Sequence, residues 1–434
     1  MQKARSFLTR NGVLGGGALG LTAALRLAQR GESVVLFERE STPGGLASGF
    51  KLGTSYLEKF YHHLFRSDTA ALALIEELGL RDRLVWPRPR TSTLIGGKRY
   101  QLDSALTVLR FGAVPLVDRL RLGAAVGYLR LERNYHRMEH TTADRWMRRY
   151  MGDRVYRTLW EPVLRGKFGD RYDEITMSWM WARIHQRSPN LGYLRGGFQQ
   201  LYDRLAEYIR QLGGETRFGS EIIGVRRDGA GTFCIEATDG EHEVDRIVST
   251  LPTALTIKLT PQLGDNYSAR YGRLDSYGAH CMILALDRPL TDVYWLNICD
   301  PGFPFVGLFE HTNYMPVEDY GGRHIVYLGN YLPMDDPLFG MNEQQVLERF
   351  LPALRRVNPD FLESWVTDHW MFKAPFAQPI VTLGYADRLP PHETPLKHFL
   401  VANMSQVYPQ DRGQSYSIAL AERLISGLPG APPR

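Results

Sequence analysis

Three glycines near the start of the chain are spaced as in a turn that holds phosphate groups. Gly15, Gly17 and Gly20 stand between the apolar pair 13–14 and the largely apolar run 21–30. At this spacing the first glycine allows a tight turn, the second lets the backbone approach a pyrophosphate, and the third lets a helix pack closely. The helix N-terminus would direct free N–H groups and partial positive charge at the phosphates. The pattern therefore predicts a strand, turn and helix that bind a dinucleotide.

An acidic residue stands at the end of the next predicted strand. The apolar run 34–37 is followed by Glu38, and a glycine pair, Gly44 and Gly45, comes after five further residues. A carboxylate at this place can accept hydrogen bonds from both hydroxyls of a ribose, and it would repel a 2′-phosphate. The spacing therefore disfavours NADP and favours a dinucleotide with an unmodified ribose.

Two pairs of neighbouring residues could take part in a reaction. His62 and His63 follow the second glycine pair, and Glu310 and His311 end a predicted strand, 306–310. A histidine beside a cofactor can orient a substrate, and a buried glutamate beside a histidine can acquire an unusual pKa and act as acid or base. The alternatives stay open: a histidine that satisfies a buried backbone group, and an exposed strand end for the second pair.

Further candidates lie later in the chain. Pro375 and Pro379 predict a fixed loop that presents Gln378, and Tyr408 precedes the last predicted helix together with the charged pair 411–412. No metal site is predicted, because the histidine and carboxylate candidates lack further ligands at helical or turn spacing. The three cysteines are widely separated and add none.

Composition fits a globular protein of about two domains. The 434 residues carry a net charge of +5 that is spread along the chain without a long Lys/Arg block, which argues against nucleic acid as a partner. No apolar run is long enough to cross a bilayer, and the few cysteines predict a reducing, cytoplasmic location. Cations ahead of the first apolar run resemble a secretory signal, but Arg26 and Arg30 interrupt that run and disfavour this alternative.

An arginine-rich helical segment, 105–151, stands apart in character. Leu116, Val117, Leu120 and Leu131 recur at roughly helical spacing with arginines between them. One interpretation is a domain helix with solvated arginines. The other is a surface that rests on an anionic membrane or binds an apolar substrate.

The candidate residues need a framework that brings them together. Gly196 and Gly197 open a predicted helix that runs to residue 212, and a last short strand, 399–403, leads through a loop into a helix over 415–426. The remaining predicted elements are a short or irregular first strand around 9–12, a hairpin at 94–102, helices at 71–80, 342–356 and 359–365, a pocket-lining loop or helix end at 160–169, and strands at 215–218, 221–226, 232–237, 243–250, 281–286, 306–310 and 325–329.

Four separated pieces of this chain resemble the superfamily of FAD-dependent amine oxidases, protoporphyrinogen oxidases and phytoene desaturases, and more distantly the UDP-galactopyranose mutases. They are the glycine turn with Glu38 and its glycine pair, the glycine-led helix after 196, the strand that holds Ile222, and the last strand, loop and helix. The resemblance implies FAD, bound non-covalently because no cysteine lies within 409–415. The implied FAD contacts are Gly15, Gly17, Gly20, Glu38, Arg39, Gly44, Gly45, Leu46, Ile222, Asn403, Gln414 and Ser415.

The resemblance also implies roles along the cofactor. Ile222 would meet the adenine, and Asn403 stands near the pyrophosphate, where relatives often carry a Gly-Asp pair. Gln414 and Ser415 would begin a helix whose N-terminus points at the N1–C2=O edge of the flavin and stabilises the negative charge of its reduced form. His63 is similar in position to the histidine of the mutases' GPHIF segment, which lies near the flavin face.

The fold implied by the resemblance is α/β, with a Rossmann-type FAD-binding domain that is discontinuous in sequence. That domain would comprise 1–95, 192–262 and 385–428. An inserted mixed α+β substrate domain with a helical subdomain would comprise 96–191 and 263–384. The last residues, 429–434, are expected to form a flexible tail, because they are rich in proline and glycine.

The activity implied by the resemblance is FAD-dependent dehydrogenation or desaturation of a C–C or C–N bond in a fairly large, partly apolar or lipid-like substrate, with hydride transfer to flavin N5. Simple amines are disfavoured, because the segment 278–282 lacks the lysine of amine oxidases. The alternatives are a redox-neutral mutase, in which Arg165 or Arg183 would hold a nucleotide diphosphate, and a non-catalytic flavin-binding protein. We also expect a cytoplasmic location and a monomer or homodimer. Peripheral contact with a membrane is a further expectation.

Overall fold

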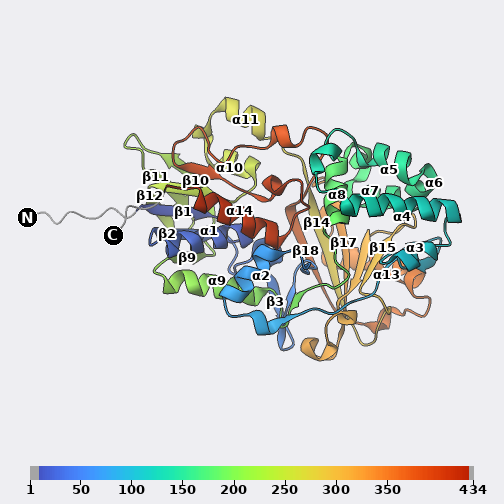
Figure 1. The fold of residues 1–434 in the computed structure, drawn as a ribbon. Coiled ribbons are helices and arrows are strands. Elements are labelled where there is room, and N and C mark those ends of the chain that lie inside the picture. Colours follow the sequence, from blue (N-terminus) through green and yellow to red (C-terminus); the bar gives the residue numbers. More distant parts are fainter. Residues whose placement is uncertain (1–8, 430–434) are drawn as a thin grey trace, which may run out of the picture.

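The computed structural model describes residues 9–429, and two β-sheets organise it (Figure 1). The first is a parallel five-stranded sheet, and the second is a mixed seven-stranded sheet toward the other end of the molecule. The strand order of the parallel sheet is β19 (Phe399–Val401), β13 (Arg246–Ser249), β1 (Arg10–Leu14), β2 (Ser33–Glu38) and β9 (Glu215–Phe218). These strands come from the beginning, middle and end of the chain, which confirms the predicted α/β fold.

The first strand is short but regular despite its polar residues. β1 pairs in parallel with β2 on one side and with β13 on the other. Asn11 is buried, and its Nδ2 donates to Glu32 Oε2 at 3.1 Å and to the Ser33 carbonyl at 2.9 Å. Arg246 Nη1 donates to Asn11 Oδ1 at 3.2 Å. Because these hydrogen bonds satisfy the amide, a polar residue is tolerated inside the sheet.

Helices cover one face of the parallel sheet, and a small antiparallel sheet covers the other. Arg26 ties the helical layer together, because it forms ion pairs at 2.7 Å with both Glu77 and Glu422. The helices are α1 (Ala18–Gln29), α2 (Thr69–Glu77), α9 (Gln199–Gln211) and α14 (Gln414–Ser426), and the small sheet contains β10 (Ile222–Arg227), β11 (Phe233–Ala237) and β12 (Gly240–Val244).

The single strand predicted over 243–250 is wrong. The chain forms β12, ends it at Val244, and starts β13 at Arg246, so the two strands belong to different sheets. Asp245 lies between them, and its carboxylate accepts a hydrogen bond from the Arg10 backbone N–H at 2.8 Å. Strand-forming residues do not reveal the point at which a chain passes from one sheet to the next.

The seven-stranded sheet packs one face against α13 (Glu343–Val357). Strand β6, at the end of the first segment predicted for the FAD-binding domain, belongs to this sheet. The strand order is β18 (Val366–Pro379), β14 (Ser276–Leu286), β17 (His324–Leu332), β16 (Gly307–Glu310), β15 (Trp295–Ile298), β6 (Thr91–Ile95) and β7 (Lys98–Tyr100).

A helical layer covers the far end of the molecule (Figure 1). Its core is rich in large side chains such as Trp146, Tyr156, Phe168 and Trp179. The layer contains α3 (Ala105–Leu109), α4 (Leu116–Leu131), α5 (Ala143–Met151), α6 (Asp153–Val155), α7 (Glu161–Phe168) and α8 (Met177–His185). Smaller elements are β3 (Gly49–Leu52), β4 (Ser55–Glu58), β5 (Leu84–Val85), β8 (Tyr193–Leu194), α10 (Thr253–Leu259), α11 (Asp265–Tyr271) and α12 (Pro337–Gly340).

Two further predictions of local structure are wrong. The segment 359–365 contains only a short 3-10 turn, Glu363–Trp365, because the Asn358 side chain accepts the Asp360 N–H at 3.0 Å and starts a turn instead. The predicted loop around Gln378 is the end of β18. Its two prolines are tolerated because β18 is an edge strand and because its pairing with β14 is interrupted by a bulge at this point.

Within residues 9–429, no helix is long and apolar enough to cross a membrane. The same part of the chain contains no group of three or more His, Cys, Asp or Glu side chains arranged to hold a metal ion. Of the predicted tail, 429–434, residues 430–434 lie outside the described residues.

Candidate cofactor and substrate cavity

A cavity of about 480 Å³ is lined by residues from both the parallel sheet and the mixed sheet. Its wall combines the turn after β1, the end of β2, the segments 44–47 and 60–65, parts of α7 and α8, strands β14 and β17, and the chain from 403 to 417. This volume is in the range of small-molecule and cofactor sites. The glycine motifs and several polar candidates therefore meet at one place, although they are far apart in sequence.

The glycine turn has the geometry that a phosphate cradle needs. Gly15 has a φ of 104°, which a residue with a side chain rarely adopts. A Cβ added at Gly20 would lie 1.9 Å from the Gly15 carbonyl oxygen, so only glycine fits there. A Cβ at Gly17 would meet no protein atom within 4 Å and would occupy the cavity instead. No described side chain caps α1 after Gly17, so its first N–H groups are available for an anion.

Glu38 lies at the end of β2 with its carboxylate beside the turn. Oε2 accepts the Gly16 N–H at 2.7 Å, and Oε1 accepts the Glu40 N–H at 3.0 Å. Glu38 lines the cavity, whereas Arg39 points away and pairs with Glu40 at 3.3 Å. The backbone therefore holds the carboxylate in place, and its remaining lone pairs are available to hydrogen-bond donors in the cavity.

The last helix begins at the wall of the cavity. No described side chain caps α14, and Gln414 lines the cavity with its Oε1 bonded to Tyr202. Its Nε2 is buried and has no hydrogen-bond partner among the described residues. Asn403 also lines the cavity, and its Nδ2 donates to Thr253 Oγ1 at 2.9 Å, which fixes the chain before this helix.

Most of the predicted FAD contacts meet in this wall. Ile222 does not, because its place at the start of β10 packs it with the core of the small sheet. Ser415 is buried behind the wall, where its Oγ accepts the Ala71 N–H at 3.3 Å. The residues that line the cavity are Gly15, Gly17, Glu38, Gly44, Gly45, Leu46, Asn403 and Gln414, and those that do not are Gly20, Arg39, Ile222 and Ser415.

The histidine pair lies in the cavity wall. His62 Nδ1 lies 2.7 Å from the Phe60 carbonyl, which can only accept, so Nδ1 carries the proton and Nε2 is free to accept one. His63 Nδ1 lies 3.3 Å from the Tyr294 hydroxyl. Burial lowers the pKa of His62 to about 4 and that of His63 to about 3. Both imidazoles are therefore uncharged at neutral pH.

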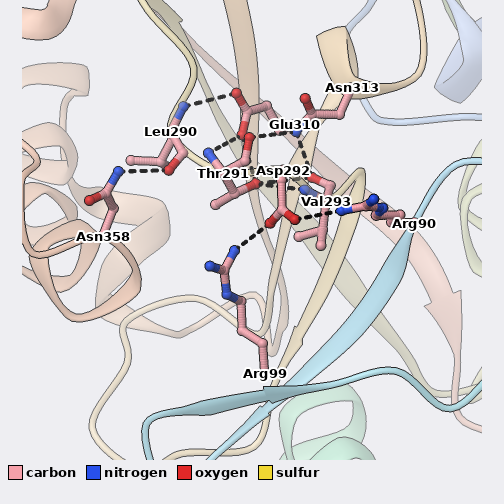
Figure 2. A network of polar contacts seen from close by, with 9 residues as sticks. All are labelled: Arg90, Arg99, Leu290, Thr291, Asp292, Val293, Glu310, Asn313 and Asn358. Carbon is pink, nitrogen blue, oxygen red and sulfur yellow. Dashed lines mark hydrogen bonds and ion pairs between the residues drawn. The ribbon is translucent and has the colours of Figure 1, made fainter. Parts of the chain in front are cut away.

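Glu310 and His311 lie outside the cavity and have structural contacts. Figure 2 shows Glu310 accepting hydrogen bonds from the Leu290 N–H at 2.9 Å, the Thr291 N–H at 2.6 Å and the Thr291 hydroxyl at 2.7 Å. These bonds fix the loop before β15, although burial raises the pKa of Glu310 to about 7. His311 Nε2 lies 2.7 Å from the Tyr320 hydroxyl. The placement gives neither residue access to a substrate in the cavity.

Gln378 and Tyr408 also lie away from the cavity wall. Gln378 is buried at the end of β18, where its Nε2 donates to the Pro379 carbonyl at 3.0 Å. The Tyr408 hydroxyl bonds Ser178 at 2.8 Å and Glu139 at 2.7 Å, which links the last loop to the helical layer. We therefore keep only His62 and His63 as candidates for contact with a substrate.

A cluster of cations surrounds one carboxylate in the cavity wall. Lys167 Nζ lies 3.2 Å from Asp411 Oδ2, Arg183 pairs with the same oxygen, and Arg412 follows Asp411 in the chain. Burial, with Arg183, holds the pKa of Lys167 well below its ordinary value. Although Asp411 is buried, these cations hold the pKa of its carboxyl far below the ordinary value.

Sequence reasoning missed two of the cavity's cations, Lys167 and Arg187. Lys167 ends α7, in the segment that was expected to be either a pocket loop or a helix end. The Arg187 guanidinium lies 4.8 Å from the centre of the Trp295 ring and has no acidic partner within ion-pair distance among the described residues. Arg187 lines the cavity and is exposed. Arg165, by contrast, pairs with Glu161 outside the cavity.

The chain belongs to the family of flavin-containing amine oxidoreductases, whose model matches residues 20–410. It is an FAD-dependent oxidoreductase, and the glycine turn, the Glu38 carboxylate and the uncapped α14 N-terminus fit that cofactor.

Solved structures share the fold at low sequence identity. A protein from Exiguobacterium sp. 255-15, described as a candidate protoporphyrinogen oxidase, has 17% identity and a TM-score of 0.77 over 96% of this chain and 98% of its own. Reduced UDP-galactopyranose mutase has 15% identity and a TM-score of 0.75 over 97% and 93% of the two chains. Putrescine oxidase bound to putrescine has 15% identity and a TM-score of 0.70 over 96% and 98%. A search of curated proteins finds no match.

Proposed function

We propose that this enzyme dehydrogenates or desaturates a C–C or C–N bond of a fairly large, partly apolar substrate that carries an acidic group. The observation that supports this most is that one cavity combines the dinucleotide cradle with a wall of aromatic and cationic side chains. FAD, when bound, supplies a hydride acceptor at N5. A cytoplasmic location and a monomeric or homodimeric state are part of the same proposal, as is the division into an FAD-binding and a substrate domain.

The residues of this chain would position both molecules. Glu38 accepts the ribose hydroxyls, the Gly15–Gly17 turn and α1 bind the pyrophosphate, and the α14 N-terminus faces the flavin edge that becomes negative on reduction. On the substrate side, the neutral ring of His62 can accept a proton at Nε2. The many cations disfavour a simple amine, because a protonated amine would be repelled.

If the enzyme holds its substrate against the flavin, reduction of the flavin can be followed by visible absorbance. We expect purified protein to show visible flavin absorbance, and we expect this band to bleach under anaerobic conditions with an apolar acid that has an oxidisable C–C or C–N bond. The measurement is anaerobic titration with a panel of such acids and matched simple amines. Bleaching by amines alone would contradict the substrate proposal, and protein without FAD would contradict the assigned site.

Arg187 is the cation best placed to receive the acidic group, because it lines the cavity and forms no ion pair with a carboxylate among the described residues. We expect Arg187→Gln in the FAD-loaded enzyme to weaken binding of benzoate or phenyl phosphate about tenfold, because a charge-assisted hydrogen bond is lost. Binding of neutral benzyl alcohol should not change. The measurement is calorimetric titration at constant ionic strength, and the two anions show whether carboxylate or phosphate is preferred.

Arg165→Gln is the matched control, because this arginine lies outside the cavity and should leave anion binding unchanged. Equal anion affinity in Arg187→Gln and the unaltered enzyme would refute the role of Arg187. Loss of FAD from Arg187→Gln would instead assign the guanidinium to the cofactor.

The same cations favour one second candidate, a redox-neutral enzyme that acts on a sugar nucleotide diphosphate. Arg183 and Arg187 could receive the two phosphates, as arginine does in bidentate contacts. Rapid-mixing kinetics separate the two candidates. Turnover by the reduced enzyme alone, with no net electron acceptor, would support the second candidate and exclude the first.

A further inference from the structure

One face of the helical layer exposes an unusual number of apolar side chains. Half of the fourteen exposed large hydrophobic residues within 9–429 lie between 106 and 131. They belong to α3 and α4, at the end of the molecule away from the parallel sheet (Figure 1). These seven are Leu106, Leu109, Leu116, Val117, Leu120, Tyr128 and Leu131, and we call their surface the α3–α4 face.

Four exposed apolar residues of α4 form a stripe along the helix. Val117, Leu120, Tyr128 and Leu131 recur at intervals that place them on one side of a helix, with exposed fractions from 46% to 81%. The opposite side of α4 is also apolar, because Leu122, Ala125 and Leu129 are buried in the core of the layer. A helix that only covered a core would carry polar residues on its outer side, so the outer stripe needs a different explanation.

The charge around this face is strongly positive. Residues 105–157 contain eleven arginines, no lysine and five acidic residues, a net charge of +6, whereas the whole chain carries only +5. Arg110, Arg130 and Arg133 are exposed, and their side chains have no hydrogen-bond or ion-pair partner among the described residues. Free arginines beside an exposed apolar stripe suit an interface of apolar chains and negative headgroups.

We propose that the α3–α4 face docks on the surface of an anionic lipid bilayer, with the apolar stripe inserted among the acyl chains and the arginines at the headgroups. A second copy of the chain fits the face less well, because it would bring two positive surfaces together. The inference is independent of the proposed reaction, since no cavity residue takes part in it.

Vesicle sedimentation with the full-length, FAD-loaded protein tests this docking. We expect at least tenfold stronger partitioning onto phosphatidylcholine vesicles that contain about one third phosphatidylglycerol than onto phosphatidylcholine alone. The double variant Val117→Glu/Leu120→Glu should abolish binding to both. Arg130→Gln/Arg133→Gln should weaken only the binding that depends on phosphatidylglycerol, and high salt should have the same effect.

The matched control is Leu212→Glu/Ile223→Glu. It adds the same two negative charges, but at exposed apolar residues at the end of α9 and in β10. This control should bind vesicles like the unaltered protein, and thermal unfolding of both double variants should be unchanged because all four sites are exposed. Equal loss in both double variants would refute the assignment to this face. The proposal would be overturned if the protein did not bind vesicles and if sedimentation velocity showed a dimer that Val117→Glu/Leu120→Glu converts to a monomer. The face would then be assigned to self-association.

Discussion

Replacing Gly17 with valine is expected to weaken FAD binding about a hundredfold while leaving the fold of the apoprotein intact. The reason is the direction of the new side chain. A Cβ at this residue meets no protein atom within 4 Å, so nothing in the chain must move, but it enters the space beside the α1 N-terminus where a pyrophosphate would lie. The measurement is FAD titration of apoprotein by flavin fluorescence, together with chemical unfolding of the same apoprotein.

Two other glycines make the result specific. Gly112→Val also places its side chain in open space, but outside the cavity, and should keep the FAD affinity of the unaltered protein. Gly20→Ala should lower both stability and FAD affinity, because its Cβ would collide with the Gly15 carbonyl oxygen at 1.9 Å. Undiminished FAD binding by Gly17→Val would mean that the pyrophosphate does not lie at this turn.

The parts of the site that could be predicted from sequence depend on local backbone geometry. The turn at Gly15 needs a positive φ, and Glu38 follows at the end of the next strand, so their spacing along the chain encodes their positions in space. The end of the chain is similarly local, because α14 begins directly after the loop that leaves β19. Such features predict a fold family even at the low identity that separates this chain from solved structures.

The substrate side could not be predicted in the same way. Lys167 and Asp411 are separated by 244 residues and meet only because α7 and the last loop pack on the same sheet. The Glu310–His311 pair shows how residue type and placement can differ. Its residue types suit acid–base chemistry. The fold, however, directs Glu310 at the neighbouring loop, where its carboxylate accepts hydrogen bonds from the Leu290 and Thr291 backbone N–H groups. Residue type alone does not tell which side of a strand end faces a cavity.

Replacing Asp411 with asparagine is expected to have the largest effect on stability. The carboxylate is the only acidic group that pairs with Lys167 and Arg183 among the described residues, and it also accepts the Trp179 indole N–H at 3.2 Å. Its neutralisation leaves buried cations without a counter-charge, which typically costs about 3–5 kcal/mol when one partner of a buried pair is removed. The measurement is the free energy of unfolding of the apoprotein in urea at neutral pH.

The pH dependence of this loss gives a sharper test. The neighbouring cations hold the pKa of Asp411 in the folded state below its value in the unfolded state. The ionised carboxylate therefore stabilises the fold fully at pH values above the unfolded-state pKa. This contribution is lost as the pH falls through the folded-state pKa. The difference in the free energy of unfolding between unaltered protein and Asp411→Asn should therefore be largest at neutral pH. It should shrink in acid below about pH 4. Asp387→Asn, at an exposed acid without an ion-pair partner among the described residues, should show little gap at any pH. A gap that stays constant into acid would show that Asp411 stabilises the cavity through packing and neutral hydrogen bonds, and that its charge does not organise the cations around it.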